Sequence, residues 1–95
     1  MKITVVCGNG LGTSLMMEMS IKNIVKELGV VADVDHVDLG SAKGTDSDIF
    51  VGTKDIADQL VAQAVAGKIV SLNNMIDKVA MKERLSVALT ELGAL

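Results

Sequence analysis

The pattern that most constrains the fold lies close to the N-terminus of the chain. Ile3 to Val6 is a short run of β-branched, mostly apolar residues, and a glycine-rich segment follows it directly. From about Ser14 the apolar residues recur at helical spacing. A buried strand, a tight loop and a helix in this order form a β–α unit, which returns the chain toward a parallel strand.

The rest of the chain continues this alternation. Further strands are expected at 30–37, 48–51 and 68–72, helices at 53–66 and about 77–92, and a loop at 39–46. The inward faces of the three helices are expected to carry Met17, Ile21, Ile24, Val25 and Leu28, then Ile56, Leu60, Val61 and Ala64, then Leu85, Ala88, Leu89 and Leu92. We predict one α/β domain over 1–95, with a Rossmann-like four-stranded parallel sheet in the order 2-1-3-4 and helices on both faces.

Composition excludes several functions. The net charge is -3, and Phe50 is the single aromatic residue, so we expect no nucleic-acid binding. No stretch approaches the roughly 20 apolar residues that cross a bilayer, and the run at 3–6 is too short for a secretory signal. One cysteine allows no internal disulfide, which fits a reducing compartment. We therefore expect a cytoplasmic protein without direct membrane insertion.

The single cysteine, Cys7, stands where the first strand meets the glycine-rich loop. Glycines let the backbone curl so that several N–H groups point inward, and the following helix adds its positive N-terminal end. These features predict an anion-binding loop at the carboxyl end of the sheet. Its expected phosphate-binding residues are Gly8, Asn9, Gly10, Leu11, Gly12, Thr13 and Ser14.

The same loop is expected to activate the thiol. A cysteine near a helix N-terminus has a lowered pKa, because the N–H groups favour the thiolate. A thiolate beside a phosphate-binding loop is a nucleophile aimed at phosphorus. The N–H groups would stabilise charge on the equatorial oxygens during in-line transfer. Cys7 is therefore the predicted catalytic residue. Thr13 and Ser14 are candidates for phosphate donors, for the helix cap, or for both.

Competing assignments of the Cys7 loop fit its residues less well. A purely structural cysteine leaves the three neighbouring glycines unexplained. The dinucleotide fingerprint needs its third glycine where Thr13 stands, and a Walker-type loop needs a lysine before Thr13. Low-molecular-weight tyrosine phosphatases share the strand, loop and helix but have an arginine at the position of Thr13. Without that bidentate clamp, a phosphocysteine would form yet hydrolyse slowly, as a carrier requires.

The loop resembles that of the IIB components of the sugar phosphotransferase system, and the ascorbate-specific branch in particular. The similarity is carried by Cys7-Gly8-Asn9-Gly10-Leu11-Gly12-Thr13-Ser14 and by the run 70–75, where a strand leads into Asn-Met before the last helix. Size and element order match along nearly the whole chain.

This resemblance implies a specific activity. Cys7 would accept a phosphoryl group from a phosphohistidine of an EIIA component and pass it to a sugar held by a membrane-embedded EIIC component, with no cofactor. The sugar implied is L-ascorbate. Another sugar, such as galactitol or a pentitol, and a phosphatase-like or thiol-sensing domain remain as alternatives. The protein would meet the inner face of the membrane transiently, through EIIC.

Four apolar residues near the loop have two interpretations. Leu11, Leu15, Met16 and Met19 lie off the core face of the first helix or in the loop, so they either dock partner proteins or pack locally. The single histidine, His36, is assigned no role. No spacing of acidic residues matches a known calcium or zinc pattern, so we expect no metal.

Overall fold

The chain forms one parallel sheet. A computed structural model describes residues 1–7, 11–65, 67–72 and 78–93, without the side chains at 7 and 11–14. The four strands lie in the order β2-β1-β3-β4, and every neighbouring pair is parallel. Their bounds are β1 Lys2–Cys7, β2 Asp33–Asp38, β3 Ile49–Thr53 and β4 Lys68–Leu72. The predicted fold class and strand order are confirmed.

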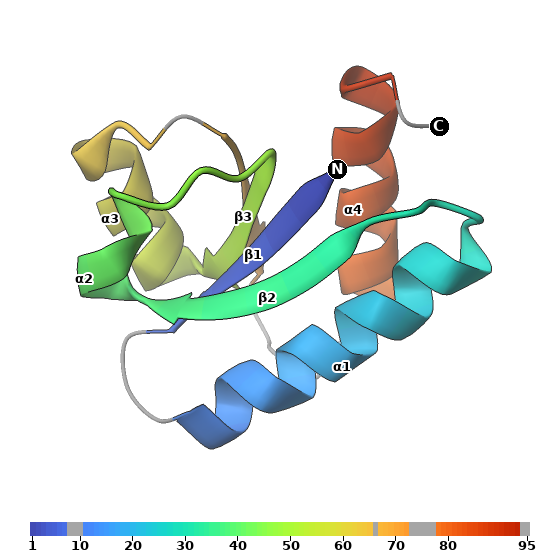
Figure 1. Cartoon of the computed structure of the whole chain (residues 1–95), viewed down its shortest axis with the longest axis horizontal. Helices are drawn as coiled ribbons and strands as arrows, with labels where there is room; N and C mark the ends of the chain where they lie inside the picture. The colour runs from blue at the N-terminus through green and yellow to red at the C-terminus, as the bar shows by residue number, and fades with distance from the viewer. Residues whose placement is uncertain (8–10, 66, 73–77, 94–95) are drawn as a thin grey trace.

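Helices cover both faces of the sheet. Their bounds are α1 Leu11–Glu27, α2 Leu39–Ala42, α3 Lys54–Gln63 and α4 Lys78–Glu91. Figure 1 shows α1 and α4 on one face and the shorter α2 and α3 on the other. Each helix begins shortly after a strand ends, so the N-termini of the helices lie toward the edge formed by the carboxyl ends of the strands. We call this edge of the sheet the carboxyl edge, and the opposite one the amino edge.

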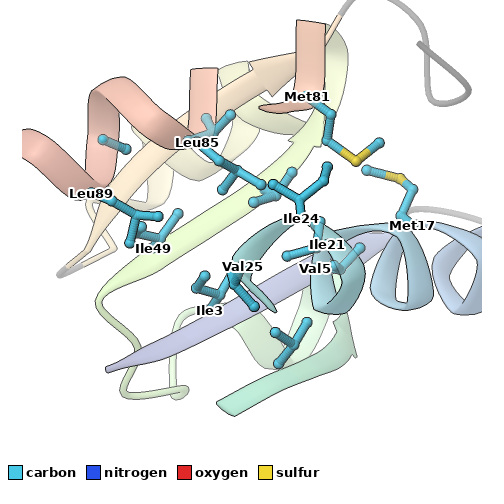
Figure 2. Close-up of a cluster of buried hydrophobic side chains, with 14 of the residues drawn as sticks. Ile3, Val5, Met17, Ile21, Ile24, Val25, Ile49, Met81, Leu85 and Leu89 are labelled. Carbon is cyan, nitrogen blue, oxygen red and sulfur yellow. The ribbon is translucent and has the colours of Figure 1, made fainter. Parts of the chain in front are cut away.

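The larger core lies between the sheet and the pair α1 and α4. The strands contribute Ile3, Val5 and Ile49 among others, all fully buried. Figure 2 shows the helix side chains that meet them, namely Met17, Ile21, Ile24 and Val25 of α1 and Met81, Leu85 and Leu89 of α4. Burying a side chain of this size contributes about 1.5–3 kcal/mol relative to leaving it exposed. This core therefore fixes α1, the helix that follows Cys7, against the sheet.

A smaller core fills the opposite face. Phe50 is fully buried there and packs with Val6, Ala42, Ile56 and Leu60. The side chains of β1 and β3 thus alternate between the two cores, as expected for strands buried on both faces.

Side-chain hydrogen bonds join the strands at the amino edge. The buried Ser47 hydroxyl lies 3.0 Å from the Lys2 carbonyl and 2.9 Å from the Ile49 carbonyl, and it accepts a bond from the Thr4 hydroxyl at 2.9 Å. The Asp48 carboxylate accepts a bond from the Lys2 backbone N–H at 2.8 Å. Two residues between α2 and β3 therefore tie β1 to β3 where both strands begin.

Two expected boundaries near the carboxyl edge are wrong. Residues 39–46 are not a loop throughout, because 39–42 form the single turn α2. The Asp38 carboxylate caps this turn by accepting a bond from the Ser41 N–H at 2.7 Å. The first helix begins at Leu11 rather than near Ser14, so Thr13 and Ser14 lie within its first turn and neither is its N-cap.

The second strand and two helix faces also differ from expectation. β2 begins at Asp33, because Gly29 has a φ of 73° and the Val30 N–H returns to the Val25 carbonyl, which extends the end of α1. Val61, predicted to face inward on α3, is 65% exposed, and Ala57 takes its place. Leu92 is exposed beyond the end of α4, whereas the core includes the unpredicted Met81.

Candidate functional site

Cys7 ends the central strand of the sheet. It pairs with Asp38, the last residue of β2. On the other side Val5 pairs with Val51, so the strand register places Cys7 level with Thr53, the last residue of β3. In parallel α/β sheets, ligands bind outside the carboxyl ends of the strands where the order reverses. In this sheet β2 lies on one side of β1 and β3 on the other, so the strand order reverses at β1. Cys7, at the carboxyl end of β1, lies at this switch point.

Helix α1 begins four residues after Cys7. The first four N–H groups of an α-helix have no acceptor within the helix, and the helix dipole adds positive potential at this end. In the described part of α1 these groups belong to Leu11, Gly12 and Thr13. No acidic residue occupies this first turn, so no carboxylate on the helix itself opposes an anion there. The predicted phosphate-binding residues Gly8, Asn9 and Gly10 lie outside the described residues.

The acidic side chains near Cys7 on the carboxyl edge already have local partners. Asp38 caps α2. Asp55, in the first turn of α3, accepts a bond from the Thr53 hydroxyl at 2.7 Å, and this bond lowers the pKa of the Asp55 carboxyl. Lys54 is exposed at the start of α3. Each of these two carboxylates thus accepts a hydrogen bond from a residue two or three positions away in the chain.

An apolar strip runs along α1 next to the site. Leu15, Met16 and Met19 are 45%, 61% and 64% exposed. Met19 lies three residues after Met16 and four after Leu15, so it neighbours both of them on the helix surface. Met17 points the other way, into the larger core. The exposure agrees with the docking interpretation of these residues rather than with local packing; the side chain of Leu11 lies outside the description.

The structure also assembles a group that the sequence did not indicate. Glu18 of α1 lies against His36 and Asp35 of β2, and one ligand-type atom from each lies within 4.8 Å of the others. Glu18 and His36 are 18 positions apart, with no motif between them. Only the packing of α1 on β2 brings them together.

A separate hollow of about 1000 Å³ opens between α1 and α4. Its α1 wall is the second half of the helix, and its lining includes Glu27, Lys78, Lys82 and Glu83. Charges of both signs line it, and Lys82 pairs with Glu27 at 3.3 Å. This hollow lies away from Leu11 and is distinct from the Cys7 site.

Among the described residues, no helix has both the length and the apolar character required to span a membrane.

The fold and the position of Cys7 define a class: small parallel α/β domains with a single cysteine between the central strand and a helix N-terminus. Comparison with known proteins identifies the family. Residues 2–87 match the family model described as the lactose/cellobiose-specific IIB subunit of the PTS. The chain is 35% identical over 89 residues to the ascorbate-specific PTS system EIIB component of Mycoplasma pneumoniae, covering 92% of this chain and 93% of that protein. The chain belongs to the IIB family of the phosphotransferase system, whose domains are phosphotransferases.

Proposed function

We propose that this chain is the IIB phosphoryl carrier of a sugar uptake system and that Cys7 holds the phosphoryl group. The observation that carries the proposal is the position of the single cysteine, at the carboxyl end of the central strand and four residues before the N-terminus of α1. Membership of the IIB family supplies the reaction class. The chain serves as acceptor and then as donor, without a cofactor.

The transfer consists of two displacements at phosphorus. The Cys7 thiolate attacks the phosphorus of a phosphohistidine on EIIA; the S–P bond forms, the P–N bond breaks, and the imidazole leaves. A hydroxyl of the sugar held by EIIC then attacks the same phosphorus; the O–P bond forms, the S–P bond breaks, the hydroxyl proton passes to solvent and the thiolate is regenerated. The backbone N–H groups of residues 8–14 stabilise the equatorial oxygens in both steps. The hydroxyls of Thr13 and Ser14 add donors.

L-Ascorbate is the proposed sugar. The Mycoplasma pneumoniae relative is named as ascorbate-specific and is similar along nearly all of both chains. The family model instead carries the description lactose/cellobiose. We favour ascorbate because the similarity to the ascorbate-specific protein extends over nearly all of both chains. The family model describes a wider group of IIB subunits. Uptake assays with the cognate EIIC, comparing ascorbate with galactitol and cellobiose, distinguish these substrates.

The exposed strip of Leu15, Met16 and Met19 is the proposed contact for the partner proteins. It begins one turn beyond the start of α1, so a protein that reaches Cys7 also passes over it. Methionine side chains adapt to different surfaces, which suits a carrier that meets EIIA and EIIC in turn. The carrier is cytoplasmic and reaches the membrane through EIIC.

The test is the intact mass of the protein after incubation with phosphoenolpyruvate, the general phosphotransferase proteins and the EIIA partner. We expect a gain of one phosphoryl group, and no gain in Cys7→Ser, which should keep the same circular dichroism spectrum. A phosphoryl group retained in Cys7→Ser would overturn the assignment, as would its absence from the wild type when the donor proteins phosphorylate another IIB acceptor.

The phosphatase alternative makes a different prediction. A phosphatase turns over an aryl phosphate without any donor protein, whereas a carrier with threonine at position 13 should hold its phosphoryl group. Steady release of product from p-nitrophenyl phosphate, abolished by Cys7→Ser, would favour the phosphatase.

A further inference from the structure

The contact between α1 and β2 contains a buried nitrogen without a hydrogen bond. Nδ1 of His36 is inaccessible to solvent, and among the described residues it has no hydrogen-bond partner. Its nearest acidic neighbour is Oε1 of Glu18, at 3.5 Å. Glu18 is itself 8% exposed, which is rare for a glutamate because burying a carboxylate is costly. A buried carboxylate therefore faces a buried imidazole nitrogen, and no hydrogen bond joins them.

Asp35 completes the group. Its Oδ1 lies 3.8 Å from the same Nδ1 and also accepts the His36 backbone N–H at 2.8 Å, which fixes the carboxylate in place. Nδ1 thus faces two carboxylate oxygens, at 3.5 and 3.8 Å. These separations are too long for good hydrogen bonds. They are close to the roughly 3.3 Å that separates ligand atoms around a tetrahedral ion with bonds of about 2.0–2.1 Å.

We propose that Glu18, Asp35 and His36 bind a divalent transition metal ion, Zn²⁺ by the nature of the ligands. One imidazole and two carboxylates are established zinc ligands, and a water molecule would take the fourth position. Asp35 is 62% exposed at its side chain, so the group opens to solvent on that side and an ion can enter. The ion would link the second turn of α1 to the edge strand β2. This site is independent of the phosphoryl transfer proposed above.

A lysine competes for the same carboxylate. Nζ of Lys22 lies 3.9 Å from Oε1 of Glu18, and the lysine side chain is 56% exposed. Its ammonium can swing into solvent when an ion binds, but it opposes the ion electrostatically. Lysine and the metal ion are therefore alternative partners of Glu18. Removing the lysine charge should tighten metal binding, whereas removing a ligand should weaken it.

The experiment is a calorimetric titration of the full chain with Zn²⁺, carried out in a Cys7→Ser background. Cys7 is the single thiol and would otherwise bind zinc itself. We expect one ion per chain. Glu18→Gln and His36→Gln should each weaken binding at least about tenfold, the loss seen even when only a group supporting a ligand is removed. Lys22→Gln should strengthen it. Asp33→Asn, on the same strand but outside the group, is the matched control and should leave the affinity unchanged.

Two further readouts make the outcome decisive. Co²⁺ in place of Zn²⁺ should give the visible absorption of a tetrahedral ion, and Zn²⁺ should raise the melting temperature until a chelator is added. The proposal is overturned if Glu18→Gln and His36→Gln, shown by circular dichroism to be folded, bind zinc as tightly as the parent. It is equally overturned if the parent shows no saturable binding, in which case the group is an ion pair only.

Discussion

The two edges of the sheet use their polar groups in opposite ways. At the amino edge, side chains bind the strands to each other: Ser47 reaches Lys2, Thr4 and Ile49, and Asp48 binds the N–H of Lys2. At the carboxyl edge, α1, α2 and α3 begin within four residues of a strand end, and the first N–H groups of a helix have no acceptor within it. Polar groups at the amino edge hold the strands together, whereas on the function proposed above the N–H groups at the start of α1 bind an anion.

On the function proposed above, this difference separates stability from phosphoryl transfer. The amino edge would hold β1 and β3 in register while the carboxyl edge alternates between its free and phosphorylated forms. Substitutions at the amino edge should therefore change the free energy of unfolding and leave phosphoryl acceptance by the folded protein intact. Substitutions at the carboxyl edge should have the converse effect.

The largest effect on stability is expected at Gly67, just before β4. A Cβ at this position would lie 2.5 Å from the Ser47 carbonyl oxygen and 2.9 Å from the Phe50 ring. Backbone and a fully buried ring must shift, so Gly67→Ala should lower the free energy of unfolding by about 3 kcal/mol. Urea denaturation measures the change. Gly44→Ala is the control, since its Cβ would find its nearest neighbour at 3.9 Å. Equal free energies of unfolding for the two variants would contradict the close packing around Gly67 at the amino edge.

The next effect is expected for Ser47→Ala. The substitution removes the hydroxyl that lies within hydrogen-bond distance of two backbone carbonyls and leaves the buried Thr4 hydroxyl without this acceptor. A loss of about 2 kcal/mol should follow, because buried polar groups are left unpaired. The folded fraction should still gain one phosphoryl group in the mass assay. A stable Ser47→Ala that fails to accept the group would show that the two edges are not separable.

A smaller effect is expected for Asp38→Ala at the carboxyl edge. The variant loses the bond from the Ser41 N–H that caps α2, which should cost about 1 kcal/mol. Asp38 pairs with Cys7 across the strands, so the rate of phosphoryl acceptance should also change. Stopped samples analysed by intact mass give this rate, with Asp33→Asn at the other end of β2 as the control. An unchanged rate would mean that the carboxyl edge tolerates the loss of this charge.

The smallest effect concerns pH and the pair Thr53 and Asp55. The Thr53 hydroxyl bond is the largest of the causes that lower the pKa of the Asp55 carboxyl in the folded state below its ordinary value. Such a group adds stability above its unfolded pKa and loses that contribution as pH falls through the folded value. Thr53→Val should therefore melt slightly below wild type at neutral pH, and the difference should vanish in acid. Carbon-13 NMR of Asp55 should show a higher pKa in the variant; an unchanged pKa would exclude the hydroxyl as its cause.

The sequence predicted the parts of the fold that depend on periodicity. The β-branched run at 3–6 and the helical spacing of Met17, Ile21 and Ile24 indicated the central strand and the first helix, and strand order followed from alternation. Helix α2 was missed because four residues containing Gly40 carry no periodic pattern, and its signal is the single Asp38 cap. Val61 was misassigned because α3 faces the sheet through the neighbouring side of the helix, which only packing reveals.

The site was predictable to a different degree. Cys7 and its loop stand in one continuous segment, so the residue types alone indicated an anion site, and strand order placed it at the carboxyl edge. Glu18 and His36 belong to separate elements, and their contact depends on how α1 lies across β2. A sequence read in one dimension contains no signal for that contact.

The most direct test of the account is the change in backbone amide NMR signals when the chain is phosphorylated through EIIA. The account predicts that the largest shifts occur at residues 8–14, where the N–H groups surround the phosphoryl group on Cys7, and that Ser47 and Asp48 at the amino edge shift little. Shifts centred on the start of α3 or on the amino edge, with residues 8–14 unchanged, would contradict it.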